Sequence, residues 1–213
     1  MVLTVGNIKG GCGKTTLSVN LAIAYSRMGR DVLLVDGDEQ ETAMAFTDLR
    51  SASKDGLCGY TAVALHGSAL RTQMRSLARK YTDVVIDVGG RDSGSLRAAL
   101  TVSDLVLIPV QPRSFDLWAV DTMLDLLQEA REVNEHLRAV SVLNAADAQG
   151  KDNESAAELL AKRAPAIEHF PQAIIRRKAF PNAAASGLSV LEYDDPKARE
   201  EFSRLAELLL NYR

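Results

Sequence analysis

The sequence is poor in several features that mark particular classes of protein. It has two cysteines in 213 residues, Cys12 and Cys58, which lie far apart and form no CxxC pair. They therefore predict neither a disulfide framework nor a cysteine metal site. No apolar run approaches the roughly 20 residues of a membrane-spanning helix, and the chain enters its first predicted strand without a leader. We expect a cytoplasmic protein with no stable membrane insertion.

An excess of positive charge is also missing. The chain has 25 Lys and Arg against 28 Asp and Glu, a net charge of −3. This balance argues against a protein coated in cations, although it leaves room for a local basic patch. The length and the 46% content of hydrophobic residues suit one domain with its own core. We expect a single domain that spans residues 1–213.

The first sixteen residues, MVLTVGNIKGGCGKTT, contain the most informative pattern. An apolar run up to Asn7 predicts a strand, and the apolar spacing after Thr16 predicts a helix that begins at Lys14. A glycine-rich loop between a strand and a helix start is typical of phosphate binding, because free backbone N–H groups can surround phosphate oxygens. Lys14 then reaches the β- and γ-phosphates, and the Thr15 hydroxyl can ligate Mg²⁺. The predicted nucleotide-binding residues in this loop are Lys9, Gly10, Gly11, Cys12, Gly13, Lys14, Thr15 and Thr16.

Two later strands are predicted to end in a carboxylate. Residues 31–36 read DVLLVD and residues 82–87 read TDVVID, so Asp36 and Asp87 stand at their carboxyl ends. Parallel α/β sheets place their ligands at this edge. The second run has the shape of a Walker B motif, whose Asp holds Mg²⁺ directly or through water. Together with Thr15, these residues predict a Mg²⁺-dependent nucleoside triphosphatase.

Strand-like and helical patterns alternate along the rest of the chain. Further strands are predicted at 104–110 and 138–144, and a long helix from Gln111 to about Asn134. This alternation predicts an α/β fold with a mainly parallel β-sheet flanked by helices on both faces. Trp118, the single tryptophan, is predicted to be a core or interface residue rather than one that stacks on bases.

Four motifs, in their order along the chain, resemble those of the ParA/MinD family of ATPases, which has a deviant Walker A motif. These are the loop with its early Lys9, the segment from Asp36 in which Glu39 replaces the usual proline of D-x-D-P-Q, the segment ending at Pro112, and a C-terminal Arg-aromatic pattern. The resemblance implies an ATP-sandwich dimer in which Lys9 crosses to the nucleotide of the second subunit. It also implies that Lys9, Lys14 and Asp36 are catalytic, with Asp36 positioning the attacking water, and that Pro112 lies near the nucleotide.

The same resemblance implies a function. ATP and Mg²⁺ would be the cofactors, hydrolysis would be slow and stimulated by a partner, and the ATP-bound homodimer would bind DNA without sequence preference on the nucleoid. The role would be plasmid or chromosome partition with a ParB-like centromere-binding protein. Because the chain starts at its first strand, we expect no N-terminal helix-turn-helix domain. A cluster of cations in an acidic protein supplies the candidate DNA-binding residues, namely Arg176, Arg177 and Lys178.

Two other functions remain open at this point. A MinD-like or other cargo-positioning ATPase would act on a membrane or a protein cargo, although the mixed charges of the C-terminal helix argue against membrane binding. A reductase similar to the nitrogenase iron protein shares the loop, but it needs cluster cysteines after the second carboxylate strand. This chain has none there.

Overall fold

The computed structural model describes residues 1–114, 116–149 and 151–212. In chain order the elements are β1 (Val2–Val5), α1 (Lys14–Arg27), β2 (Val32–Asp36), α2 (Thr42–Ser53), β3 (Thr61–Ala64), α3 (Gly67–Leu77), β4 (Asp83–Asp87), α4 (Gly94–Leu100), β5 (Leu105–Val110), η1 (Pro112–Ser114), α5 (Leu117–Arg131), β6 (Arg138–Ala146), α6 (Asp152–Arg163), β7 (Glu168–His169), β8 (Ile174–Ile175), α7 (Ala179–Ala184), η2 (Val190–Glu192) and α8 (Pro196–Asn211).

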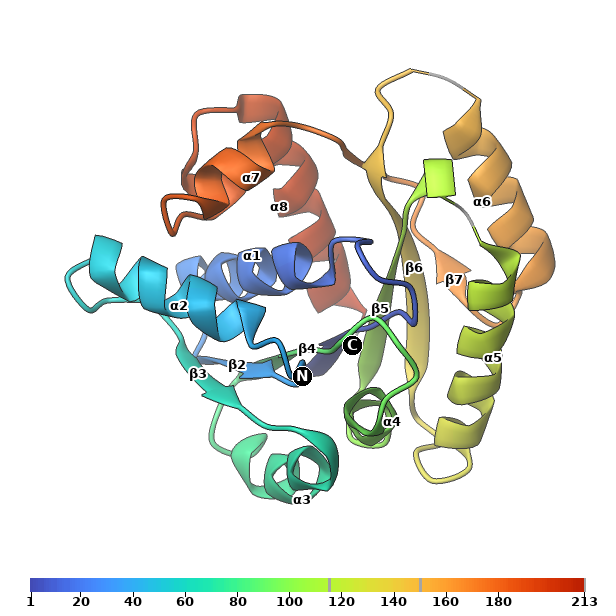
Figure 1. The fold of residues 1–213 in the computed structure, drawn as a ribbon, viewed down its shortest axis with the longest axis horizontal. Helices are drawn as coiled ribbons and strands as arrows, with labels where there is room; N and C mark the ends of the chain where they lie inside the picture. Colours follow the sequence, from blue (N-terminus) through green and yellow to red (C-terminus); the bar gives the residue numbers. More distant parts are fainter. Residues whose placement is uncertain (115, 150, 213) are drawn as a thin grey trace.

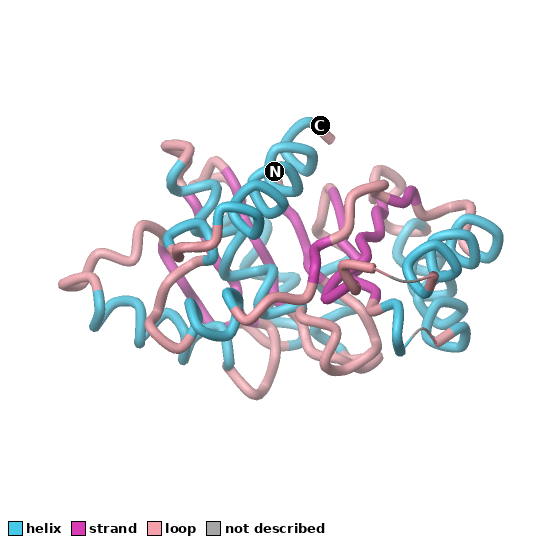
Figure 2. Tube along the Cα trace, turned by 90° about the horizontal axis from the view of Figure 1, so that it is seen from above, coloured by secondary structure: helices cyan, strands magenta, loops and turns pink. Residues whose placement is uncertain are grey.

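The strands form one parallel sheet at the centre of the molecule (Figure 1). Their order is β3-β2-β4-β1-β5-β6-β7, with β8 paired to the end of β6. Each strand pair that the structure describes is parallel. The helices cover the two faces of this sheet, as the view from above in Figure 2 also shows. The predicted α/β fold with a mainly parallel sheet is therefore confirmed.

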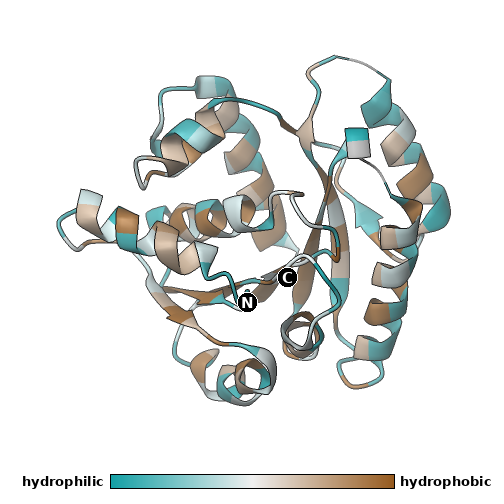
Figure 3. Ribbon diagram, in the orientation of Figure 1, coloured by the Kyte–Doolittle hydropathy of each residue, from teal (hydrophilic) through white to brown (hydrophobic). Residues whose placement is uncertain are grey.

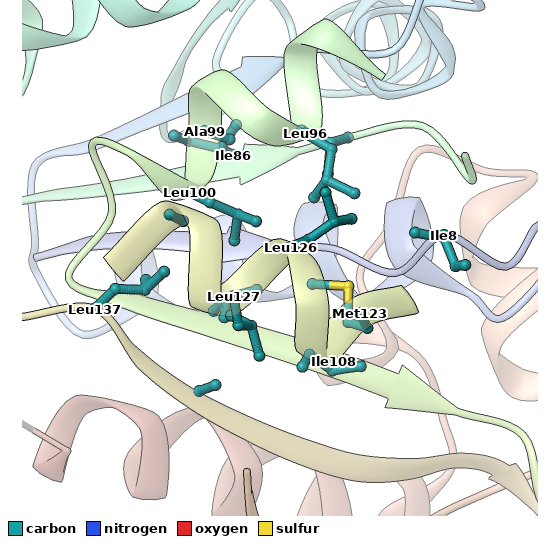
Figure 4. Packing of buried hydrophobic residues seen from close by; sticks show 14 of the residues in the cluster. Ile8, Ile86, Leu96, Ala99, Leu100, Ile108, Met123, Leu126, Leu127 and Leu137 are labelled. Atoms are coloured by element: carbon teal, nitrogen blue, oxygen red, sulfur yellow. The ribbon is translucent and has the colours of Figure 1, made fainter. Parts of the chain in front are cut away.

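Two hydrophobic cores fill the space between the sheet and its helices. Successive strand residues point to opposite faces, so Leu33 and Leu34 belong to different cores. One core packs α3, α4, α5 and α6 against the sheet, and the other packs α1, α7 and α8. Figure 4 shows the first core, where Met123 and Leu126 of α5 approach Leu96 of α4. The strands are hydrophobic while the outer faces of the helices are polar (Figure 3).

The segment after β5 differs from the prediction. The helix does not begin at Gln111: residues 112–114 form the short turn η1, and α5 begins only at Leu117. The reason is the Asp116 carboxylate, which accepts hydrogen bonds from the backbone N–H groups of Trp118 and Ala119 and so caps the helix there. Phe115, which the predicted helix included, lies outside the described residues. Trp118 is exposed, so its predicted place in the core is wrong.

Other differences concern the second half of the chain. The strand predicted to end at Asn144 continues to Ala146, which shortens the loop predicted to follow it. The sequence also gave no sign of the short elements β7, β8 and α7. Among the described residues, no helix has the length and apolar character needed to cross a membrane.

A nearly buried ion pair ties α2 to the C-terminal part of the chain. The Arg50 guanidinium donates to both carboxylate oxygens of Glu192, at 2.7 and 3.1 Å, and to the Gly187 carbonyl at 3.0 Å. Burial by itself would raise the pKa of Glu192, but Arg50 and the Ser189 N–H outweigh it and hold that pKa below its ordinary value. The carboxylate therefore stays charged and fixes the position of α2.

Replacing Arg50 with alanine should lower the free energy of unfolding by about 3 kcal/mol, because it leaves the Glu192 carboxylate without its main partner. Urea denaturation measures this change. Arg204→Ala is the matched control, since Arg204 pairs with Glu200 on the exposed face of α8, and it should cost less than about 0.5 kcal/mol. Equal effects of the two substitutions would contradict the role given to Arg50.

Candidate functional site

The phosphate loop lies between β1 and the first turn of α1, at the carboxyl ends of the central strands. Gly13 has a φ of +89°, and a side chain at this position would collide with the Asn144 amide. That amide donates to the Cys12 carbonyl at 2.8 Å, and the Gln111 amide donates to the Gly11 carbonyl at 2.8 Å. Side chains from β6 and from the end of β5 thus hold the loop open for a ligand.

Lys14 is buried at the start of α1 and reaches back over the loop. Its Nζ donates to the Lys9 carbonyl at 2.9 Å and lies 3.8 Å from Cys12 Sγ. Burial raises the pKa of Cys12, so this thiol stays neutral beside the ammonium group. The Lys9 backbone N–H in turn donates to the Asn7 side chain at 3.0 Å. These bonds fix the loop with the Lys14 charge at its centre.

The segment after β4 closes against the same loop. A Cβ at Gly90 would lie 2.7 Å from Gly10 Cα and 3.0 Å from Lys14 Nζ. Only a glycine fits so close to another backbone. The structure therefore joins the phosphate loop to the segment that follows the Asp87 strand, as a site for the terminal phosphate requires.

Asp36 and Asp87 occupy paired positions in the neighbouring parallel strands β2 and β4. The Asp36 carboxylate accepts hydrogen bonds from Asp38 N at 3.1 Å and from Met44 N at 2.9 Å. Its burial raises its pKa in spite of these bonds. Burial raises the pKa of Asp87 to about 7, and the nearby Asp36 charge adds to that shift. Two buried carboxylates repel each other and so favour a cation between or beside them.

The residues present fit a magnesium ion. Asp87 Oδ1 accepts a hydrogen bond from the Ser18 hydroxyl at 3.0 Å, whereas Asp87 Oδ2 is buried and accepts none from the described residues. The Thr15 hydroxyl lies close enough to Asp87 to lower its pKa in part. The described residues contain no group of three or more His, Cys, Asp and Glu side chains that could hold a metal alone. Mg²⁺ suits this arrangement, since it usually keeps waters and takes phosphate oxygens.

An open pocket of about 250 Å³ adjoins the phosphate loop on the side of α7. Its walls come from the loop, the ends of β5 and β6, the β8 segment and the start of α7. The sequence analysis missed most of these residues, because they are brought together only by the fold. Pro112 does not line this pocket, whereas the neighbouring Gln111 does. The lining residues are Gly13, Thr16, Gln111, Asn144, Ala145, Ile174, Ile175, Arg176, Arg177, Phe180 and Pro181.

Comparison with known proteins agrees with this geometry. A model of the CobQ/CobB/MinD/ParA nucleotide binding domain matches residues 3–190. The chain belongs to this family. It is 30% identical to the maintenance of carboxysome distribution protein A of Halothiobacillus neapolitanus, over 89% of this chain and 86% of that protein. It is 32% identical to the protein of the same name from Gloeobacter kilaueensis, over 98% and 93%.

A solved structure of this family has the same fold. The structure of apo McdA from Cyanothece, printed as Cyanthece, superposes with a TM-score of 0.81 at 18% identity, over 97% of this chain and 98% of that one. The family membership makes Lys9 to Thr16 the nucleotide-binding loop of a nucleotide-binding domain. The individual roles of Lys9, Lys14, Asp36 and Asp87 remain predictions.

The candidate DNA-binding residues lie on the rim of this family's nucleotide site. Arg177 forms an ion pair with Glu201 of α8, which neutralises its charge. Arg176 and Lys178 are exposed and form no ion pair within the described part of the chain. The predicted patch of three cations is therefore reduced to two available charges, because a carboxylate from a later helix has folded against the third.

Proposed function

We propose that the protein is a Mg²⁺-dependent ATPase that dimerises around ATP, binds DNA without sequence preference and positions a cargo along it. The observation that carries this proposal is the close approach of Gly90 to Gly10 and Lys14, beside the carboxylates of Asp36 and Asp87. This arrangement unites a phosphate loop, a cation, a magnesium site and a segment that can sense the terminal phosphate. It suits phosphoryl transfer to water.

Each residue has a separate part in the proposed reaction. Lys14 Nζ exchanges the Lys9 carbonyl for phosphate oxygens, and its charge stabilises the negative charge on the phosphates. The Asp36 carboxylate, fixed by the Asp38 and Met44 N–H groups, orients the attacking water and accepts a hydrogen bond from it. Lys9 adds its charge to the phosphates of the second subunit. Hydrolysis by the isolated protein is slow and rises when a partner is bound.

Thr15 and Asp87 would hold the magnesium ion, with Asp36 close to its shell. When bound, the ion neutralises charge on the phosphates and so assists the attack of water. The unpaired Asp87 Oδ2 supports this assignment, because a buried carboxylate oxygen without a hydrogen bond is costly unless a cation faces it. The base of ATP would occupy the pocket beside Asn144 and Phe180.

The nature of the cargo distinguishes two versions of this function. The names of the two relatives reported above concern carboxysome distribution, which favours a protein cargo carried over the nucleoid. Partition of a plasmid or chromosome with a ParB-like partner is the second version, favoured by the order of the ParA-like motifs in the sequence. Both versions require ATP-gated DNA binding, which is tested first.

Removing Arg176 and Lys178 together should weaken DNA binding to any sequence and reduce the log–log salt slope by about two, one for each lost phosphate contact. A salt titration with two unrelated duplexes, in ATP and in ADP, measures both effects. The ATP form should bind more tightly, because a dimer presents two patches to one duplex. ATP affinity is measured in parallel, since Arg176 borders the nucleotide pocket.

The matched control removes Arg79 and Lys80, two cations just beyond α3 on the other side of the sheet. It changes the net charge equally and should leave the salt slope as in the wild type. Equal slopes in the two double variants, or equal affinity in ATP and ADP, would exclude these residues from DNA binding.

A further inference from the structure

The first turn of α5 presents large apolar side chains to solvent. Trp118 is the single tryptophan of the chain and is 71% exposed, and the preceding Leu117 is 45% exposed. Burying a tryptophan against another protein surface contributes strongly to binding, which is why this residue is common at the centre of interfaces. An exposed pair of this kind on a fixed element indicates an interaction surface.

The backbone that carries Trp118 is held in place. The Asp116 carboxylate accepts a hydrogen bond from Trp118 N at 3.0 Å and caps the helix. Below it, Ala119, Val120 and Met123 are buried in the core. The indole therefore projects from a rigid helix end, so that little conformational entropy is lost in the backbone when a partner covers it.

The start of α5 also adjoins the phosphate loop. Asp116, Gln111 and Lys9 line a single pocket, and the Gln111 amide bonds to the loop at Gly11. Lys9 is the residue that the proposed dimer sends across to the second nucleotide. A second copy that approaches Lys9 must therefore also approach the first turn of α5.

The charges near this turn favour a second copy over a nucleic acid. Arg163 pairs with Asp121, one turn along α5 from Trp118, with both contacts at 2.8 Å. Arg113, on the turn before α5, pairs with Asp147 at 2.6 Å. Because each of these cations is neutralised, the surface offers no net attraction to phosphates, and two identical surfaces meet without strong like-charge repulsion.

We propose that Trp118 is an interface residue of the nucleotide-bound homodimer, buried against a second copy of this chain and exposed in the monomer. This inference rests on the proposed ATP-dependent dimer and assigns a residue to its interface. In a two-fold dimer the same side chain is buried twice, so one substitution removes two contacts.

The single tryptophan makes the test direct, because the intrinsic fluorescence of the full-length protein excited at the indole band reports on Trp118 alone. Emission spectra are recorded with a slowly hydrolysed ATP analogue and Mg²⁺, with ADP and Mg²⁺, and without nucleotide, over a range of protein concentrations. We expect a shift to shorter wavelength with the ATP analogue only, and a midpoint that follows the dimer fraction in sedimentation velocity.

Substitutions give the second readout. Trp118→Ala should raise the dimer dissociation constant at least about tenfold, as expected for a tryptophan at the centre of an interface, while Trp118→Phe should restore part of the affinity. Leu57→Ala is the control, because Leu57 is 77% exposed but follows α2, at the opposite end of the molecule from α5 (Figure 1). Its dimer should form as in the wild type.

The outcomes separate this inference from the function on which it rests. If the wild type forms a dimer with the ATP analogue, but its emission is unchanged and Trp118→Ala dimerises normally, Trp118 lies outside the interface and only this inference fails. If the wild type stays monomeric with the analogue, the proposed dimer fails and this inference fails with it. Burial of Trp118 by a different protein would leave the purified wild-type spectrum unchanged, which also overturns the inference.

Discussion

Replacing Asp36 with alanine should lower the rate of ATP hydrolysis about 100-fold or more, the range expected for loss of a group that accepts a proton or orients water. The affinity for ATP should stay close to that of the wild type. The reason is that a carboxylate adds no attraction to the phosphates, whereas its fixed position between Asp38 N and Met44 N suits it to hold a water molecule.

Lys14→Ala gives the contrasting result. Its ammonium group contacts phosphates before the reaction as well as during it, so its loss should weaken ATP binding about tenfold or more and also reduce turnover. Calorimetry measures affinity, and phosphate release measures turnover. Asp48→Ala, an exposed carboxylate on α2, is the control and should behave as the wild type. Hydrolysis at the wild-type rate by Asp36→Ala would refute its role.

Lys9→Ala should bind ATP as a monomer but fail to form the ATP-dependent dimer, and should therefore lose most of its hydrolytic activity. In the monomer, the contacts of the Lys9 backbone are to Asn7 and to the Lys14 ammonium, and these survive the substitution. What is lost is the positive charge that the proposed dimer places beside the partner's phosphates. Sedimentation velocity with a slowly hydrolysed ATP analogue measures the dimer, and normal dimers of this variant would remove the hypothesis.

The parts of the site that could be predicted are those encoded within short stretches of chain. The glycine-rich loop, Lys14 and Thr15 lie within one strand–loop–helix unit. Asp36 and Asp87 each end an apolar strand, and the rule that ligands gather at the carboxyl ends of parallel strands brings them to one edge. For the same reason the α/β fold followed from the alternation of apolar runs and helical patterns.

The parts that were missed depend on contacts between distant segments. Asn144 holds the loop at Cys12 from 132 residues away, and nothing in the sequence near Asn144 specifies that β6 ends beside this loop. The polar residue at the end of its strand was the one available signal. The close approach of Gly90 to Gly10 depends in the same way on the strand order, in which β4 lies next to β1.

Charge counts along the chain failed for a related reason. Arg177 counted as a free cation in the sequence, but the fold places Glu201 of α8 against it. Trp118 was expected in the core because tryptophan is usually buried, yet the cap at Asp116 directs the first turn of α5 outward. A local count of residues cannot include partners that only the tertiary structure supplies.

Mixing two inactive variants tests the shared site most directly. In a dimer of Lys9→Ala with Asp36→Ala, the site on the Lys9→Ala subunit has its own Lys14 and Asp36 and receives Lys9 from the other subunit. We predict that an equal mixture regains activity, up to about a quarter of the wild-type rate, since about half of randomly formed dimers are mixed and each has one complete site. Activity no higher than the sum of the two variants measured separately would contradict a site shared between two subunits.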